Sequence, residues 1–107
     1  MSKHYILDEH NNPVPCDNLA RWTKEMENHK MENHKMWRVG ELNKDKVRVS
    51  TVFLGLDHNF NDAGPPVLFE TMIFGGKHNE YQERCSTWEE AEALHKKAVK
   101  LVLGGKQ

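Results

Sequence analysis

The chain lacks three features that mark familiar protein classes: closely spaced cysteine pairs, long apolar runs and a large net charge. Cys16 and Cys85 form no Cys-x-x-Cys pair, and a disulfide between them would need an oxidising compartment. No window approaches the about 20 apolar residues that a membrane span needs. Fifteen basic and 16 acidic residues leave a net charge of −1, so no overall field draws the chain to nucleic acid or to a membrane.

The N-terminal sequence also lacks a secretion signal, because Met1–Asp8 contains no apolar segment of roughly 7–15 residues. We therefore expect the protein in the reducing cytoplasm of the host cell, with Cys16 and Cys85 as free thiols. At 107 residues, 37% hydrophobic and 29% charged, the chain is typical of one soluble globular domain that spans residues 1–107.

The first quarter of the chain predicts a short strand and then a helix. Tyr5–Leu7 is an apolar run that ends in the turn-forming residues Asp8–Pro13. Val14–Pro15 is expected to continue extended, because a residue before proline avoids the helical region. Asp17 is a good N-cap, and apolar residues follow it at helical spacing, so we place a helix from about Asn18.

A perfect tandem repeat obscures the far end of this helix, since Met31–Lys35 repeats Met26–Lys30. At about 100° per residue, a shift of this length turns a helical side chain by about 140°. The equivalent methionines therefore cannot share one apolar stripe, and His29 and His34 do not form a paired-histidine metal face. We interpret residues 26–36 as a short duplication that lengthens the helix or the loop after it.

The middle of the chain predicts an apolar β-hairpin. Val47–Leu54 and Val67–Phe74 are rich in β-branched and aromatic residues, and the long loop Asp57–Pro66 lies between them. Consecutive strands most simply pair antiparallel. The preceding Gly40–Lys46 is polar and is expected to be a turn.

The C-terminal part predicts a second helix. Ser86–Glu89 has the pattern of a capping box, in which a hydroxyl and a carboxylate each accept a backbone N–H. One apolar stripe follows, made of Trp88, Ala91, Leu94, His95, Ala98 and Val102. The predicted fold is thus α+β in the order β-α-β-β-α. The helices are expected on the hairpin face that carries Val49, Phe53, Phe69 and Ile73.

Several motifs resemble those of a known family. They are Thr51–His58, Leu68–Gly76, and Ser86–Glu92 with His95, joined by Tyr5–Asp8, Pro13–Pro15, Asp17 and Trp22 near the N-terminus. On these residues the chain resembles, over most of its length, a widespread family of small proteins carried by phages and prophages. The resemblance implies a phage or prophage origin and no particular activity. The duplication in residues 26–36 departs from the family pattern.

The titratable residues offer few sites of known chemistry. Seven histidines show no zinc-ligand spacing, so we expect no metal and no cofactor. Asp57 and His58, at the mouth of the hairpin loop, are either an acid–base pair or a loop cap beside a solvated histidine. Adjacent residues of a strand face opposite ways, which favours the second interpretation. His95 lies on an apolar helical stripe, where a lone histidine is more often a core residue than a ligand.

Glu70 is the strongest candidate for a binding residue, because a carboxylate inside an apolar strand is costly to bury without a partner. A symmetric hairpin centred near Asn61 places Val52 opposite Glu70, although a slip by one residue would exchange the partners. Thr51 and Thr71 fall on the other hairpin face. The candidate binding residues are Glu70, Asp57, His58, Thr51, Thr71 and His95.

The Glu70 face of the hairpin is expected to be an interface. Two helices can cover one face, and the other would expose an apolar patch of the kind that marks interfaces or ligand grooves. The candidate interface residues are Val52, Leu54, Leu68, Met72 and Phe74. We therefore expect a homodimer, or a bound partner or ligand. The alternative is that the first helix and the Asp57–Pro66 loop fold back and cover the patch.

Three classes of function remain, since no phosphate loop, serine elbow or other catalytic motif occurs. The favoured class is a phage-type binding protein that acts on a host protein, as in counter-defence or host takeover, or sequesters a small ligand. The second is a small enzyme that uses Glu70 with His58 or His95. The third is a nucleic-acid-binding accessory protein, which the balanced charge disfavours.

Overall fold

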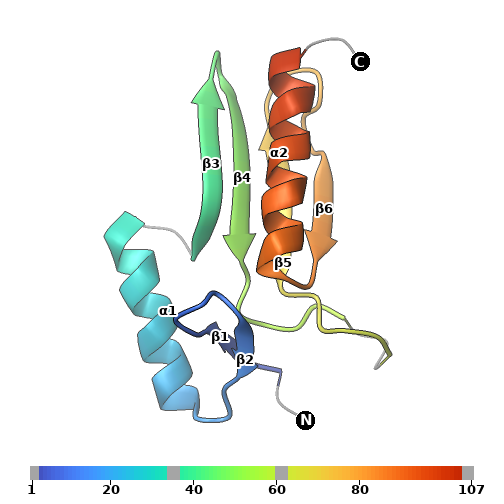
Figure 1. Ribbon diagram of the computed structural model, residues 1–107. Coiled ribbons are helices and arrows are strands. Elements are labelled where there is room, and N and C mark those ends of the chain that lie inside the picture. The colour runs from blue at the N-terminus through green and yellow to red at the C-terminus, as the bar shows by residue number, and fades with distance from the viewer. Residues whose placement is uncertain (1–2, 34–36, 60–62, 105–107) are drawn as a thin grey trace.

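The computed structural model describes residues 3–33, 37–59 and 63–104. In chain order the elements are β1 (Tyr5–Leu7), β2 (Pro13–Pro15), α1 (Leu19–Asn33), β3 (Arg38–Lys44), β4 (Val47–Phe53), β5 (Phe69–Phe74), β6 (Gln82–Cys85) and α2 (Trp88–Gly104). β1 and β2 form a two-stranded antiparallel sheet, and the larger sheet has the order β3-β4-β5-β6. The predicted α+β class is confirmed (Figure 1).

The predicted hairpin is the centre of the larger sheet. β4 and β5 pair antiparallel, with Val52 opposite Glu70 as a hairpin centred near Asn61 requires. The expected order β-α-β-β-α lacks three strands, because β2 pairs with β1 and each hairpin strand has an outer neighbour. β3 pairs with β4, and β6 pairs with β5.

β3 overturns the prediction of a turn over Gly40–Lys46. It is an edge strand, and a β-bulge between Arg38 and Gly40 breaks its alternation of side chains. The true turn is shorter, because Asp45 and Lys46 alone connect β3 to β4 with φ angles of 51° and 69°. Polar residues along an edge strand and a bulge together conceal the period-two pattern by which a strand is recognised.

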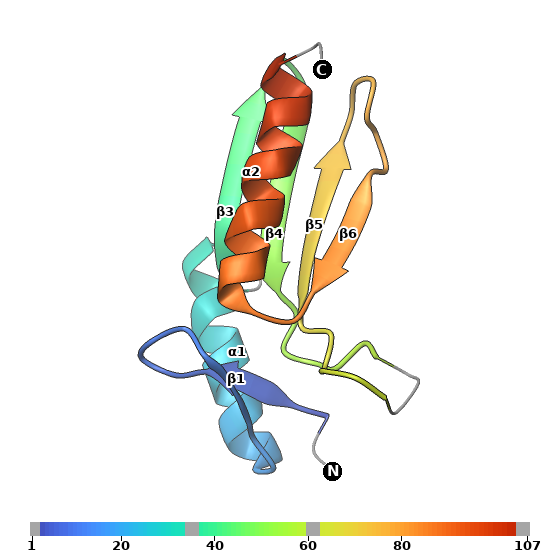
Figure 2. The ribbon, with the colours of Figure 1, turned by 45° about the vertical axis from the view of Figure 1, so that its right-hand side comes forward.

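α2 lies along one face of the four-stranded sheet (Figure 1; Figure 2). Ala91 and Ala98 are buried beneath it, and Ala98 packs against Val49 and Ile73. The stripe predicted for this helix is therefore the one that faces the sheet. The capping box is shifted by one residue, since Thr87 and Glu90 exchange side-chain-to-backbone hydrogen bonds of 3.1 Å.

α1 does not join α2 on the sheet, which corrects the expectation that both helices share one face. It packs against β1 near the end of β4, below the sheet in Figure 1. Trp22 Nε1 donates to the Gly55 carbonyl at 3.1 Å. Gly55 has φ of +78°, and a Cβ there would lie 2.8 Å from Met26 Cε, so this glycine permits the helix to dock.

The start and the end of α1 refine two further predictions. Asn18, and not Asp17, caps the helix, because its Oδ1 accepts the Arg21 N–H at 3.0 Å. α1 continues to Asn33, so the first copy of the repeat and the start of the second are helical. Residues 34–36 of the repeat lie outside the described residues. No helix among the described residues is long and apolar enough to cross a membrane.

Candidate functional site

The face of the four-stranded sheet opposite α2, here called the open face, has no described helix or strand over it (Figure 1; Figure 2). Strand register and alternation assign its side chains. They are Arg38, Glu41 and Asn43 of β3, Arg48, Ser50 and Val52 of β4, Glu70, Met72 and Phe74 of β5, and Gln82 and Arg84 of β6. The predicted Glu70 face is therefore the face that α1 leaves uncovered.

Three apolar side chains lie on the two central strands of the open face. Val52 and Met72 are half-buried, and Phe74 is 40% exposed. The Arg48 guanidinium lies 5.2 Å from the centroid of the Phe74 ring, a cation–π distance. These apolar side chains thus lie beside charged residues, and an arginine side chain covers part of the Phe74 ring.

Glu70 has partners on the neighbouring strand. Its side chain is only 15% exposed, and its Oε2 lies 2.9 Å from Arg84 Nε in an ion pair. Gln82 Nε2 donates a hydrogen bond to the same oxygen. These two side chains of β6 offset the cost of partly burying the charge. The polar strand β6, which the predicted order β-α-β-β-α does not contain, supplies both of them.

A second carboxylate, Glu41, was not found from the sequence because β3 was expected to be a turn. Its side chain is 12% exposed, and its Oε1 lies 3.3 Å from Arg38 Nη2 and its Oε2 3.5 Å from Arg48 Nε. Asn43 Nδ2 donates to Glu41 Oε2 at 2.8 Å. The signal that could have found it is short, because Glu41 and Asn43 alternate with Leu42 but the bulge breaks the alternation towards Arg38.

The two arginines around Glu41 are incompletely satisfied. The Nε atoms of Arg38 and Arg48 are buried and have no hydrogen-bond partner among the described residues. A buried donor without an acceptor costs about 1–3 kcal/mol. Their side chains are still 31% and 35% exposed, so part of each guanidinium group is accessible from the open face.

The structure brings three other predicted residues together on the opposite, α2-covered face. Thr51 Oγ1 lies 2.7 Å from Thr71 Oγ1 and 2.8 Å from His95 Nδ1. Both threonines are fully buried, and burial lowers the pKa of His95 below its ordinary value. A Cβ at Gly40 would lie 2.8 Å from the His95 ring, so the bulge of β3 makes room for it. This chain of contacts joins helix to sheet.

Asp57 caps the loop as sequence reasoning favoured, whereas His58 is half-buried and bonded to the backbone and is not simply solvated. Asp57 Oδ1 accepts the backbone N–H groups of Asn59 at 2.8 Å and Val67 at 2.9 Å, which closes the base of the loop. His58 Nδ1 bonds the Leu56 carbonyl at 2.8 Å. Both side chains therefore bond the backbone of the loop.

Leu68 was predicted to be an interface residue, and this prediction is wrong. β5 begins at Phe69, so the strict alternation counted from Glu70 does not extend back to Leu68. The Leu68 side chain is 1% exposed and belongs to the core, and its N–H donates to the Cys85 carbonyl at 3.0 Å. Leu54 follows the end of β4 and is half-buried.

The arrangement gives little support to catalysis. Glu70 and His95 lie on opposite faces of the sheet and cannot form an acid–base pair. Among the described residues, no three histidine, cysteine or acidic side chains are grouped to hold a metal ion. Burial raises the pKa of the Cys85 thiol to about 11, which makes it a poor nucleophile. Cys16 and Cys85 are both free thiols.

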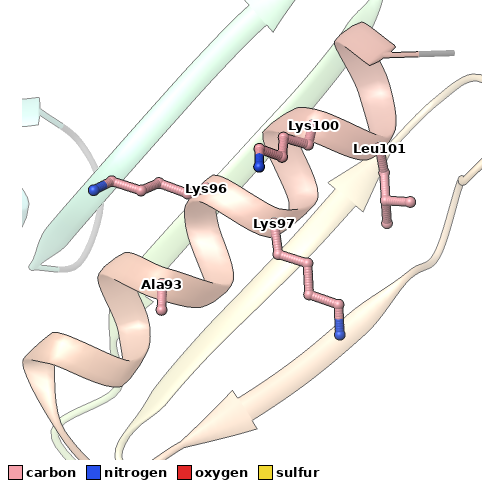
Figure 3. A pocket seen from close by; sticks show the side chains of 5 residues that line it. All are labelled: Ala93, Lys96, Lys97, Lys100 and Leu101. Carbon is pink, nitrogen blue, oxygen red and sulfur yellow. The ribbon is translucent and has the colours of Figure 1, made fainter. Parts of the chain in front are cut away.

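A hollow of about 450 Å³ lies on the outer side of α2, lined by Ala93, Lys96, Lys97, Lys100 and Leu101. Figure 3 shows that Lys96 and Lys97 extend to opposite sides of the helix. Lys97 Nζ is engaged by Glu83 Oε1 at 3.0 Å. The lysines therefore do not converge on one position, and the hollow is weaker as a site than the open face.

Comparisons of this chain with protein-family models, with curated proteins and with solved structures find no match.

Proposed function

We propose that this chain is a protein-binding module that docks a partner protein on the open face of its four-stranded sheet. The observation that carries the proposal is the one-sided cover of the sheet. α2 covers one face, and the other exposes Met72 and Phe74 among paired charges. An apolar centre with a polar border is the usual composition of a protein interface.

The identity of the partner rests on the resemblance to phage and prophage proteins. Motifs such as Thr51–His58 and Leu68–Gly76 support a phage-type protein that acts in the host cytoplasm. We therefore propose a host protein as the partner, as in counter-defence or host takeover. A second copy of the chain is the competing occupant of the open face, because symmetric pairs of identical patches are common interfaces.

The test compares partners captured from host lysate by three tagged proteins: the wild type, Met72→Lys and Ala93→Lys. Ala93 is exposed on the outer side of α2, so its variant adds the same charge away from the open face. We expect one partner that the wild type and Ala93→Lys retain and that Met72→Lys loses. Retention of the same partners by Met72→Lys would place the interaction elsewhere and overturn the proposal.

A further inference from the structure

The charges of the open face indicate the chemistry of its partner. Three arginines face two carboxylates there. Each guanidinium group has five N–H donors and no acceptor. The Glu70 carboxylate forms an ion pair with Arg84 and accepts a hydrogen bond from Gln82. The remaining two arginines, Arg38 and Arg48, share Glu41. This end of the face therefore has more donors than acceptors.

The contacts of Arg38 and Arg48 hold these surplus N–H donors on the open face. Arg48 is held between the Phe74 ring, 5.2 Å from its centroid, and Glu41 Oε2, 3.5 Å from its Nε. Neither Arg38 Nε nor Arg48 Nε finds a hydrogen-bond acceptor among the described residues. Glu41 Oε2 already accepts from Asn43. The two Nε atoms are buried, so a carboxylate from outside would pair with the remaining N–H groups of the two side chains, which are 31% and 35% exposed.

The size of the face argues for a segment and against a second copy of the chain. Four strands about 4.8 Å apart, each roughly six residues long at about 3.3 Å per residue, give a plane of about 400 Å². A stable complex of two folded proteins buries about 800 Å² of accessible surface on each partner, so a second folded copy would also contact surface beyond this plane. A short segment of polypeptide fits the smaller area.

The same face is poorly suited to single-stranded nucleic acid. Such proteins stack successive bases on several aromatic rings. The open face has one exposed ring, Phe74, and Arg48 already lies over it. The carboxylates of Glu41 and Glu70 would also repel a phosphate chain.

We infer that the open face binds a short acidic segment of its partner protein, and this inference rests on the proposed function. A carboxylate of the segment pairs with Arg38 and Arg48, and a neighbouring apolar side chain covers Met72 and Phe74. Arginine is well matched to this task because its planar fork binds carboxylates with two parallel hydrogen bonds.

The test uses an acetylated octapeptide of alternating glutamate and leucine as the probe. The matched control replaces glutamate with glutamine, and an oligothymidine of the same length represents nucleic acid. We expect saturable binding of the glutamate peptide, about 10-fold tighter than that of the glutamine peptide. The arginine Nε–H signals of Arg38 and Arg48 in the wild type should shift on binding, which gives a readout that needs no variant.

Variants locate the site. Arg38→Gln and Arg48→Gln should each reduce the preference for the glutamate peptide by about 10-fold. Lys96→Gln, on the outer side of α2, should leave that preference unchanged. Equal binding of both peptides, no saturable binding or tighter binding of oligothymidine would overturn the inference. So would a wild-type dimer, seen by light scattering, that Met72→Lys dissociates.

This inference and the proposed function fail in different ways. If the peptide shows no preference for glutamate but Met72→Lys still loses its host partner, the open face binds a protein of other chemistry. If Met72→Lys keeps every partner, the open face is not the docking surface and both fail.

Discussion

The two faces of the four-stranded sheet satisfy their polar groups in different ways. On the α2-covered face, Thr51 and Thr71 are fully buried, uncharged and hydrogen-bonded to each other, and His95 completes the chain. On the open face, Glu70 and Arg84 are charged and keep part of their surface in water. Helix cover excludes water, and only neutral, satisfied groups are inexpensive to bury there.

The difference between the two faces is seen within β5, because alternate side chains of a strand point to opposite faces of the sheet. Ile73 is fully buried against α2, whereas Met72 beside it is half-buried on the open face. Neighbouring residues of one strand therefore provide matched pairs of variants. The loss of stability in each pair shows whether the open face behaves as a surface or as a second core.

The largest difference is expected for aromatic truncation. Phe69→Ala should lower the free energy of unfolding by about 3–5 kcal/mol. The ring is fully buried and lies 5.3 Å from that of Phe53 and 6.2 Å from that of Trp88. Phe74→Ala, the same change on the open face, should cost less than about 1 kcal/mol. Equal losses in urea unfolding would contradict the comparison.

The aromatic pair also shows how far the sequence predicts the fold. Phe69 and Phe74 were assigned to opposite faces by alternation, and the β4–β5 register agrees. This succeeded because the hairpin strands are strongly apolar and their connection is local. The edge strands β3 and β6 were missed, because their sequences are largely polar and show little hydrophobic alternation. Backbone hydrogen bonds to the neighbouring strands β4 and β5 hold them in the sheet.

The candidate site was predictable only in part. Glu70 was identified because a carboxylate in an apolar strand needs a partner, but the partner Arg84 depended on finding β6. Glu41 depended likewise on β3. Thr51, Thr71 and His95 were predicted separately, and only tertiary packing of α2 shows that they contact one another. Local pattern finds elements, whereas packing decides which side chains meet.

A smaller effect is expected for one buried hydroxyl. Thr51→Val preserves shape but leaves Thr71 Oγ1 and His95 Nδ1 without their shared partner, which should cost about 1–3 kcal/mol. Ser50→Ala, the adjacent residue on the open face, also removes a buried hydroxyl, but no described side chain depends on it, so it should cost less than Thr51→Val. The two midpoints of urea unfolding measure the difference. A larger loss for Ser50→Ala would mean that the open face holds the more important polar contact.

The smallest expected effect is a dependence of stability on pH that His95, on the α2-covered face, produces. Burial lowers the pKa of His95 from its ordinary 6.5, so the unfolded chain binds its proton more readily. The stability that neutral His95 contributes is fully present above that ordinary pKa. It is lost as the pH falls through this value towards the pKa of the folded state. His95→Gln should remove this part of the slope in urea unfolding, and an unchanged slope would show that His95 does not titrate as described.

The central claim is that one sheet carries a core face and a binding face, and Met72 and Ile73 test it most directly. The measurement is the free energy of unfolding in urea for Met72→Lys and Ile73→Lys beside the wild type. Ile73→Lys should abolish cooperative unfolding, because it places a charge without a partner beneath α2. Met72→Lys should stay folded and lose no more than about 1 kcal/mol. If Met72→Lys is destabilised as severely as Ile73→Lys, the open face belongs to the core and the account is contradicted.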